Sequence, residues 1–286
     1  MVSVTSDNPT SNWKMFQLLG ADLYQHSPKV SLDIKNCLGV PVFVTLDACH
    51  LIKLVRNAFG DLKEFISPDG SLIKWQYLVH LNNLQCEKKL HLSTKIRAAH
   101  IDYTSNRMKV CLATQTISKS GAKALTLCDK VLKLPLFNGS SATSEFLIMF
   151  NDIFDWLNSK KNKGSDCGSE VRLPISRETF SKFSEFFATA KSYICSLKHV
   201  DGKYVIDGKR KQAFLGLICT MKSFVYIYRC YVQTRQMKYI LTYKYSQDHL
   251  EHFFGMIRQS LGCNNNPTTI QVKWFRFCLK LRLEEH

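Results

Sequence analysis

The chain has 286 residues, of which 45% are hydrophobic, and this composition predicts a soluble globular protein of about two domains. Its 39 basic and 23 acidic residues give a formal net charge of +16 at pH 7, which favours polyanionic partners such as nucleic acid. Eleven cysteines at irregular spacings, without a CxxC pair, argue against a disulfide framework and for reduced thiols in the cytosol or nucleus.

Asp47 stands between a predicted strand and a predicted helix. Residues 1–14 are polar, which predicts a disordered or junction segment. Apolar residues then alternate over residues 39–46, as in a buried strand, and recur at helical spacing over residues 48–59. Asp is a favoured N-cap residue, and in open α/β sheets active groups follow the carboxyl ends of strands. Both interpretations of Asp47 stand at this point.

The middle of the chain, from about residue 74 to residue 237, has mainly helical periodicity. A stretch rich in Gly, Ser and Lys at residues 158–170 predicts a loop. The most apolar run, residues 214–232, is long enough to span a bilayer, but Lys222 and Arg229 lie within it. We therefore predict a buried helix and no membrane partner.

Residues 246–267, SQDHLEHFFGMIRQSLGCNNNP, predict an amphipathic helix that ends near Gly262. Asp248 and Glu251 are three residues apart and share one face of this helix. That face is either a solvated acidic surface or one that aims Glu251 into a cleft. Walker, HExxH and GxSxG patterns are absent, which argues against P-loop, zincin and α/β-hydrolase functions.

Five blocks of sequence, taken in order, resemble the P-element family of DNA transposases, including its THAP-domain-containing relatives. They are LDACHLIKLVRNAF (46–59), TKIRAAHI (94–101), MKVCLATQTIS (108–118), FDWLNSK (154–160) and SQDHLEHFFGMIRQSLGCNNNPT (246–268). The resemblance implies a mixed α/β, helix-rich chain with an incomplete RNase H-like fold, split by a large, mostly α-helical GTP-binding insertion domain. The implied division is 1–14 junction, 15–66 RNase H-like, 67–240 insertion and 241–286 RNase H-like.

The resemblance also implies roles for particular residues. Asp47 and Glu251 match two carboxylates of a three-carboxylate site that binds Mg²⁺ or Mn²⁺. Asp248 matches the aspartate that contacts the guanine of GTP, and Asp155 is expected to face the same nucleotide. Four basic residues are candidate contacts to DNA phosphates, namely Lys53, Arg56, Arg258 and Lys273.

The chain departs from the family pattern before Asp47. The first carboxylate should follow an earlier strand, and Asp22 and Asp33 lack that context. No Cys/His cluster precedes Asp47 to form a zinc-dependent DNA-binding domain. We therefore expect a fragment of a GTP-dependent cut-and-paste DNA transposase that is inactive alone.

Transposon ends, target DNA and further copies of the chain are its expected partners, and the nucleus is its expected location. Whether this chain is itself an enzyme stays open. The alternatives are a domesticated regulator that binds DNA and nucleotide without catalysis, and a protein-interaction scaffold built on the helical block.

Overall fold

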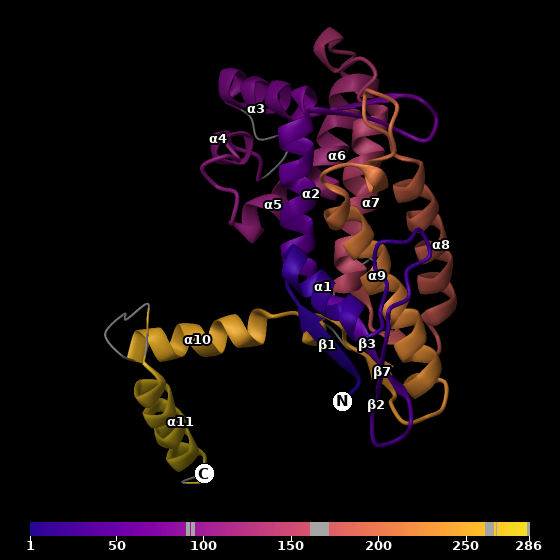
Figure 1. The fold of residues 1–286 in the computed structure, drawn as a ribbon. Coiled ribbons are helices and arrows are strands. Elements are labelled where there is room, and N and C mark those ends of the chain that lie inside the picture. The colour runs from indigo at the N-terminus through magenta and orange to yellow at the C-terminus, as the bar shows by residue number, and fades with distance from the viewer. Residues whose placement is uncertain (90–91, 93–94, 161–171, 261–265, 267, 285–286) are drawn as a thin grey trace. The chain divides into compact units, whose positions relative to one another are not determined.

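The structure, a computed structural model, describes residues 1–89, 92, 95–160, 172–260, 266 and 268–284 (Figure 1). The chain divides into two compact units, Met1–Ser246 and Gln247–His286, and each is described by itself. The predicted loop at residues 158–170 lies outside the described residues from 161 onwards. So does the Gly262 turn predicted to follow the last amphipathic helix.

A small mixed sheet lies in the Met1–Ser246 unit. Its strands are β1 (Ser3–Ser6), β2 (Ser31–Lys35) and β3 (Pro41–Leu46), in the order β1-β3-β2. Strand β1 runs parallel to β3, with Ser3 opposite Phe43 and Ser6 opposite Leu46, while β2 runs antiparallel to β3. The predicted strand before Asp47 is therefore confirmed, and it is the central strand of this sheet.

The prediction of a disordered segment at residues 1–14 is wrong. Residues 3–6 pair with β3, and helix α1 (Thr10–Leu18) follows them. Trp13 and Phe16 of this helix are fully buried in the core. The polar composition of this segment does not predict its folded structure, because the strand β3 and the core residues that stabilise it lie far along the chain.

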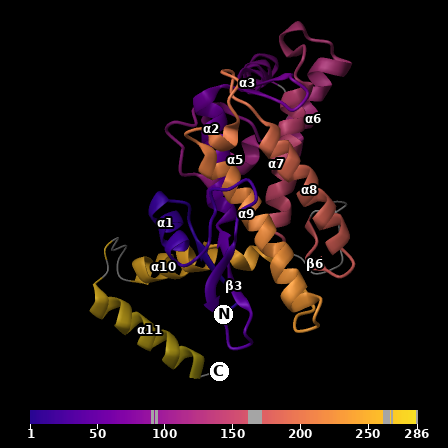
Figure 2. The same cartoon turned by 45° about the vertical axis from the view of Figure 1, so that its right-hand side comes forward.

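Long helices run side by side in this unit: α2 (Ala48–Leu62), α7 (Ser141–Leu157), α8 (Phe180–Ser196) and α9 (Lys211–Ile227) (Figures 1 and 2). Helix α9 packs on both β3 and α2, and it continues into the π-helical turn η5 (Tyr228–Val232). The predicted buried helix is thus confirmed. The stretch Lys211–Val232 is long and apolar enough to cross a membrane, but 78% of its most apolar window is buried inside the protein.

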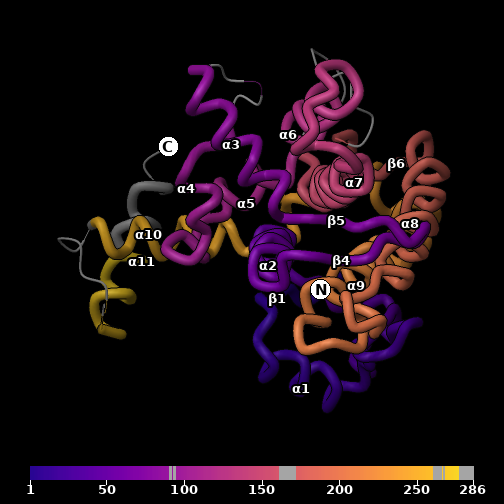
Figure 3. The backbone as a smooth tube through the Cα atoms, turned by 90° about the horizontal axis from the view of Figure 1, so that it is seen from above, coloured from indigo at the N-terminus to yellow at the C-terminus, as the bar shows by residue number. Residues whose placement is uncertain are grey.

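Aromatic rings join these helices to the hairpin formed by β4 (Glu64–Ile66) and β5 (Leu72–Lys74). Phe65 of β4 lies 5.8 Å from the Phe146 ring of α7 and 6.0 Å from the Phe214 ring of α9, measured between ring centroids. Figure 3 shows the hairpin reaching from the end of α2 towards α8, where Ile66 forms a backbone bridge with Lys198.

The remaining elements of this unit are short, apart from α3. They are α3 (Gln76–Lys88), α4 (Ala98–Ile101), α5 (Val110–Thr116), α6 (Lys119–Thr126), η1 (Leu127–Val131), η2 (Pro135–Phe137), β6 (Ile175–Ser176), η4 (Val205–Asp207), β7 (Tyr239–Ile240) and η6 (Thr242–Tyr245). Strands β6 and β7 pair with each other, so the stretch after α7 meets the stretch after α9.

The Gln247–His286 unit contains α10 (Asp248–Ser260) and α11 (Thr269–Glu284). Helix α10 confirms the predicted amphipathic helix, and Ile257 on this helix is buried. Phe253 of α10 and Phe275 of α11 bring their ring centroids within 6.1 Å. Helix α11 was not expected from the sequence.

Candidate functional site

Asp47 lies directly after β3, at the start of α2. Its Oδ2 atom accepts a hydrogen bond of 2.9 Å from the backbone N–H of His50, so Asp47 is the N-cap of α2. Only 4% of the residue is exposed. The cap interpretation is therefore confirmed, and the same residue also occupies the carboxyl end of the central strand.

Asp7 lies at the same edge of the sheet. Ser6 is the last residue of β1 and pairs with Leu46, and the backbone N–H of Asp47 donates to the carbonyl of Ser6 at 2.9 Å. Neighbouring strands lie about 4.8 Å apart, so Asp7 and Asp47 follow adjacent parallel strands at one edge. The Asp7 carboxylate also accepts a 2.9 Å hydrogen bond from the side-chain amide of Asn12.

The sequence analysis missed Asp7 because it assigned residues 1–14 to a disordered segment. The usable signal was the pair Val2 and Val4 before Asp7, a short copy of the alternation that precedes Asp47. The two alternatives do not fit an edge site. Asp22 forms an isolated bridge with Lys29, and Asp33 makes a solvent-exposed ion pair with Lys29.

Two hydroxyl groups of α9 hold the end of β3 in place. Thr220 accepts a hydrogen bond of 3.0 Å from the backbone N–H of Leu46 and lies 3.4 Å from its carbonyl oxygen. Ser223 donates to the carbonyl of Val44. Both hydroxyls are buried, so the backbone beside Asp47 is fixed by the core helix behind it.

Carboxylate oxygens are the hard ligands that Mg²⁺ prefers, and Asp7 and Asp47 present two such groups at one edge. Within the residues that the structure describes, no cluster of three or more His, Cys, Asp or Glu side chains is placed to hold a metal ion. Among the described residues, the edge therefore carries two carboxylates and no complete metal site. Glu251 and Asp248 lie in the first turn of α10, in the Gln247–His286 unit, which is described by itself.

Asp155 lies near the end of α7 in a second polar cluster. Its Oδ2 atom accepts hydrogen bonds from the Asn151 side-chain amide at 3.1 Å and from Nε of Arg172 at 3.2 Å. Burial raises the pKa of the Asp155 carboxyl, and the neighbouring Arg172 charge partly opposes that shift. The side chain keeps 15% exposure, so a ligand can still reach it.

Asn158 extends this cluster, and the sequence analysis did not single it out. Its Oδ1 atom is buried and has no hydrogen-bond partner in the described part of the chain. Asn158 is the C-cap of α7 and follows Asp155 by three residues. Because its Oδ1 atom is shielded from solvent, an N–H group of a ligand can pair with it only after the neighbouring side chains move. The signal was present in the FDWLNSK block, where the two residues stand together.

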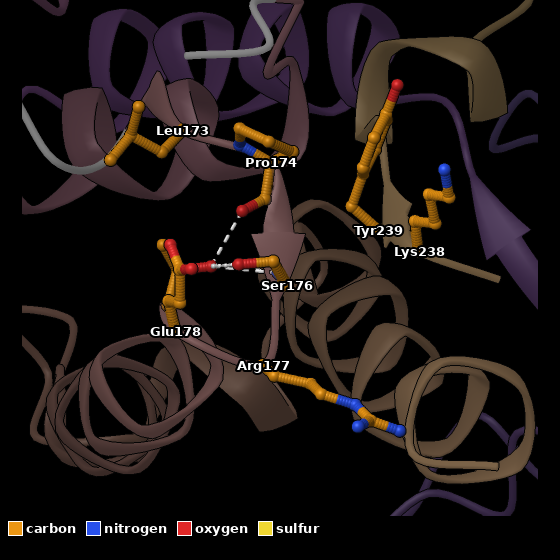
Figure 4. A pocket seen from close by; sticks show the side chains of 8 residues that line it. Leu173, Pro174, Ser176, Arg177, Glu178, Lys238 and Tyr239 are labelled. Carbon is orange, nitrogen blue, oxygen red and sulfur yellow. Dashed lines mark hydrogen bonds between the residues drawn. The ribbon is translucent and has the colours of Figure 1, made fainter. Parts of the chain in front are cut away.

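A pocket of about 430 Å³ follows Arg172 along the chain and is lined by Leu173, Pro174 and Tyr239, among others (Figure 4). Arg177 of the same pocket donates to the backbone carbonyls of Val232 and Gln233 at 3.3 and 3.0 Å. The guanidinium is thus engaged by the end of η5. These contacts give Arg177 a structural role there.

The four basic candidates for DNA contact separate into two groups. Arg258 of α10 and Lys273 of α11 are exposed, as a phosphate contact requires. Arg56 is fully buried, donates to the backbone carbonyl of Asn106 at 3.0 Å, and has a pKa lowered by burial. The predicted DNA contact by Arg56 is therefore wrong, and Lys53, with 9% exposure, does not fit that role either.

Comparisons with known proteins define the class first. The family model of the TNP-like GTP-binding insertion domain matches residues 49–169, and that of the TNP-like RNase H C-terminal domain matches residues 243–275. The chain is thus an RNase H-like protein with a GTP-binding insertion domain. The insertion match begins within α2 rather than at residue 67, and the division of the chain into domains stays a prediction.

Relatives then identify the family. The chain is 32% identical to human DNA transposase THAP9 over 285 residues, which are 99% of this chain and 31% of the relative. It is 28% identical to the Transposable element P transposase of Drosophila melanogaster over 280 residues, covering 96% of this chain and 34% of the relative. The solved Drosophila P element transposase strand transfer complex superposes with a TM-score of 0.78 at 27% identity, covering 96% of this chain and 58% of that one.

The chain therefore belongs to the P-element family of DNA transposases, as its sequence blocks predicted. It spans about a third of the length of the curated relatives it matches.

Proposed function

We propose that this chain is the nucleotide-binding and RNase H-like part of a GTP-dependent, cut-and-paste DNA transposase. The observation that carries the proposal is the polar cluster at the end of α7. There the partly exposed carboxylate of Asp155 and the unpaired Oδ1 atom of Asn158 lie within the residues matched by the GTP-binding insertion domain.

Guanine is the base that suits this cluster. Its N1–H and 2-amino groups are adjacent donors, and one carboxylate can accept from both, whereas adenine presents an acceptor at N1. We assign Asp155 and Asn158 to the base, with Asp248 as a third contact on the strength of its match to the family motif.

For the DNA chemistry we assign Asp7 and Asp47 at the sheet edge and Glu251 of α10. Bound Mg²⁺ or Mn²⁺ would stabilise the entering and leaving oxygens of a phosphodiester during an in-line displacement. The capping of α2 fixes the position of Asp47, and the pairing of β1 with β3 fixes the position of Asp7 at the same edge. Arg258 and Lys273 are proposed to contact DNA phosphates, and the protein is proposed to act in the nucleus.

The nucleotide assignment is tested by titrating the purified chain with GTP and with ATP in a calorimeter. We expect GTP to bind and ATP to bind at least about tenfold more weakly, because adenine places the acceptor N1 beside its 6-amino group and does not offer the Asp155 carboxylate two adjacent donors. Equal affinities for the two nucleotides would refute guanine recognition. Asn158→Ala should weaken GTP binding, while Asn83→Ala, at an exposed position on α3, is the control.

The metal assignment is tested by Mn²⁺ binding followed by electron paramagnetic resonance. Asp7→Asn and Asp47→Asn should each weaken Mn²⁺ binding, whereas Asp33→Asn should leave it unchanged because Asp33 is paired with Lys29 on the surface. An assay for cleavage of transposon-end DNA in the presence of Mg²⁺ then distinguishes the transposase hypothesis from the hypothesis of a regulator without catalysis. Binding of GTP and DNA without any cleavage would favour the domesticated regulator.

A further inference from the structure

Another pocket of the Met1–Ser246 unit, of about 390 Å³, lies between α9, the start of β3 and the loop that precedes β2. Phe43 of β3 and Tyr226 of α9 line it together with the stretch from Ser27 to Ser31. Its volume falls within the range of small-molecule sites in proteins, about 300–1,000 Å³. The residues assigned above to the nucleotide and to metal are not among those that line it, so this is a separate site.

Two aromatic rings form one wall of this pocket. The rings of Phe43 and Tyr226 stack with their centroids 5.9 Å apart and their planes inclined by only 5°. Phe43 is 3% exposed and Tyr226 is 37% exposed, so a buried ring supports an accessible one. An accessible ring that is held in one orientation offers a stacking surface to a planar ligand.

Lys222 places a positive charge beside the same ring. It precedes Tyr226 by four residues on α9, so the two share a helix face, and its Nζ atom lies 5.9 Å from the Tyr226 centroid. Nζ donates to the carbonyl of Pro28 at 2.7 Å and to the hydroxyl of Ser27 at 3.3 Å. These bonds to neutral oxygens use two of the three N–H donors of the ammonium group.

The charge of the pocket favours an anionic ligand. Burial lowers the pKa of the Lys222 ammonium, and the nearby charge of Lys191 lowers it further. Lys29 also lines the pocket and is paired with Asp33 at 3.0 Å, whereas the described residues that line the pocket include no Asp or Glu. An anion beside Lys222 therefore compensates a charge that its neighbours disfavour.

An unpaired nucleotide combines the two features that this pocket suits. Its base has two flat faces, and its phosphate is an anion. In a duplex the neighbouring bases cover both faces of each base, so only an unpaired base can stack on a protein ring. The chain carries a net charge of +16, which favours a nucleic acid over an isolated aromatic acid.

We propose that this pocket binds an unpaired nucleotide of single-stranded DNA, with the base stacked on Tyr226 and a phosphate beside Lys222. The inference rests on the proposed binding of DNA by this chain. Phe43 precedes Asp47 by four residues, which is about 13 Å along β3. A single strand held at the pocket therefore lies within a few nucleotides of the edge that carries Asp7 and Asp47.

The test is fluorescence anisotropy of the full chain with a labelled oligothymidylate of about 12 nucleotides. An abasic strand of the same length is the control ligand, because it has the phosphates without the bases. The wild type should bind the oligothymidylate more tightly. Tyr226→Ala should weaken that binding about tenfold, since one stacked base is lost, and should leave the affinities for the abasic strand and for duplex DNA unchanged.

Two further variants separate the aromatic ring from its bulk. Tyr226→Phe keeps the ring and should keep the wild-type affinity, whereas Tyr226→Leu keeps an apolar side chain and should lose as much as Tyr226→Ala. Tyr204→Ala is the matched control, because Tyr204 is 43% exposed and lies outside this pocket. It should bind the oligothymidylate like the wild type.

Lys222→Gln tests the phosphate contact. The slope of log affinity against log salt concentration should become shallower by about 0.7, the value for one lost contact to a single strand. A purely structural Lys222 would change the affinity without changing this slope. An unchanged slope therefore contradicts the placement of a phosphate beside Lys222.

A measurement on the wild type covers the case in which the Tyr226 variants do not fold. Cys230 lines the pocket, and Cys86 of α3 is exposed. Excess oligothymidylate should slow alkylation of Cys230 by iodoacetamide at least about fivefold, as measured by mass spectrometry, and should leave Cys86 unchanged. Alkylation of Cys230 at the same rate with and without the oligothymidylate would overturn the proposal.

The remaining outcomes distinguish this inference from the proposed function. If Tyr226→Ala binds the oligothymidylate like the wild type, the pocket does not hold a base, although the proposed binding of DNA stands. An equal loss of affinity for the oligothymidylate and the abasic strand in Tyr226→Ala also contradicts stacking. If the wild type binds neither single-stranded nor duplex DNA, the proposed function fails and the inference fails with it.

Discussion

The edge of the sheet and the end of α7 each carry a candidate carboxylate, but they hold it in different ways. Asp47 accepts a hydrogen bond from the amide of His50, three residues along its own helix. Asp155 accepts one hydrogen bond from Asn151 of its own helix and a second from Arg172, which lies 17 residues away beyond the end of that helix. In both regions a buried threonine fixes the adjacent backbone: Thr220 at the end of β3, and Thr242 at the end of α7.

This difference in hydrogen-bond partners indicates how far each region can change its conformation when a ligand binds. The backbone around Asp47 is held by strand pairing, a helix cap and the core helix α9, so its position at this edge is fixed by the fold. The Asp155 cluster is held by side chains from separate segments, and it can rearrange when a ligand replaces one of them. We therefore expect the edge to be rigid and the Asp155 cluster to rearrange more readily when a ligand binds.

The largest expected effect sharpens the assignment of the α7 end. Asp155→Asn should weaken GTP binding about 100-fold, or about 2.7 kcal/mol, because the amide presents a donor to a base that also presents donors. The same variant should gain affinity for xanthosine triphosphate, whose 2-carbonyl accepts from an amide. Titration calorimetry with both nucleotides measures the loss of affinity for GTP and the gain of affinity for xanthosine triphosphate.

The neighbouring Asp152→Asn is the matched control, since Asp152 is paired with Lys119 at 2.6 Å. It should leave the preference for guanine intact. An equal loss of GTP affinity in the two variants would show that general negative charge, rather than recognition of the base by Asp155, is involved.

The next effect concerns the rigid region. Thr220→Val should lower the free energy of unfolding by about 1–3 kcal/mol, because the backbone N–H of Leu46 loses its buried partner. Urea denaturation measures this change. Thr234→Val, which removes an exposed hydroxyl bonded to the Cys230 carbonyl, should cost less than about 0.5 kcal/mol. Equal costs at the two sites would contradict the view that α9 holds the end of β3.

A smaller effect separates the two roles of Asp47. Asp47→Ala removes the cap of α2 and should cost about 1 kcal/mol of stability, whereas Asp47→Asn keeps a cap and should cost a few tenths. Both variants should lose Mn²⁺ affinity, since neither carries the charge. Unfolding midpoints and metal titrations on the same samples test this. If Asp47→Asn binds Mn²⁺ like the wild type, Asp47 is a cap and nothing more.

The smallest effect is a pH dependence confined to the α7 end. Burial raises the pKa of Asp155 in the folded protein, so its stabilising contribution is complete below the unfolded pKa and is lost as pH rises through the folded pKa. The stability of the wild type relative to Asp155→Asn should therefore fall as the pH rises from about 4 towards neutrality. Unfolding midpoints across that range measure the trend. A relative stability that rises with pH would mean that the Arg172 ion pair outweighs burial.

Much of the candidate site could be predicted where the signal is local. The alternating strand, Asp47 and the following helix lie within about twenty consecutive residues, so periodicity and a capping residue were sufficient. The amphipathic helix α10 was predicted for the same reason, with Asp248 and Glu251 on it. Arg56 was misassigned because sequence alone does not show that α2 is buried on nearly all sides.

The sequence by itself determined the helical middle of the chain, helix α10, the central strand, Asp47 as a candidate cap and the membership of the P-element family, because these depend on neighbouring residues or on blocks in order. Only the tertiary structure decided that Asp7 lies beside Asp47 and that Arg56 is a core residue. It likewise decided that Thr220 and Thr242 anchor the two candidate sites. These facts depend on hydrogen bonds between residues 40 to 174 positions apart, and no local pattern encodes such partners.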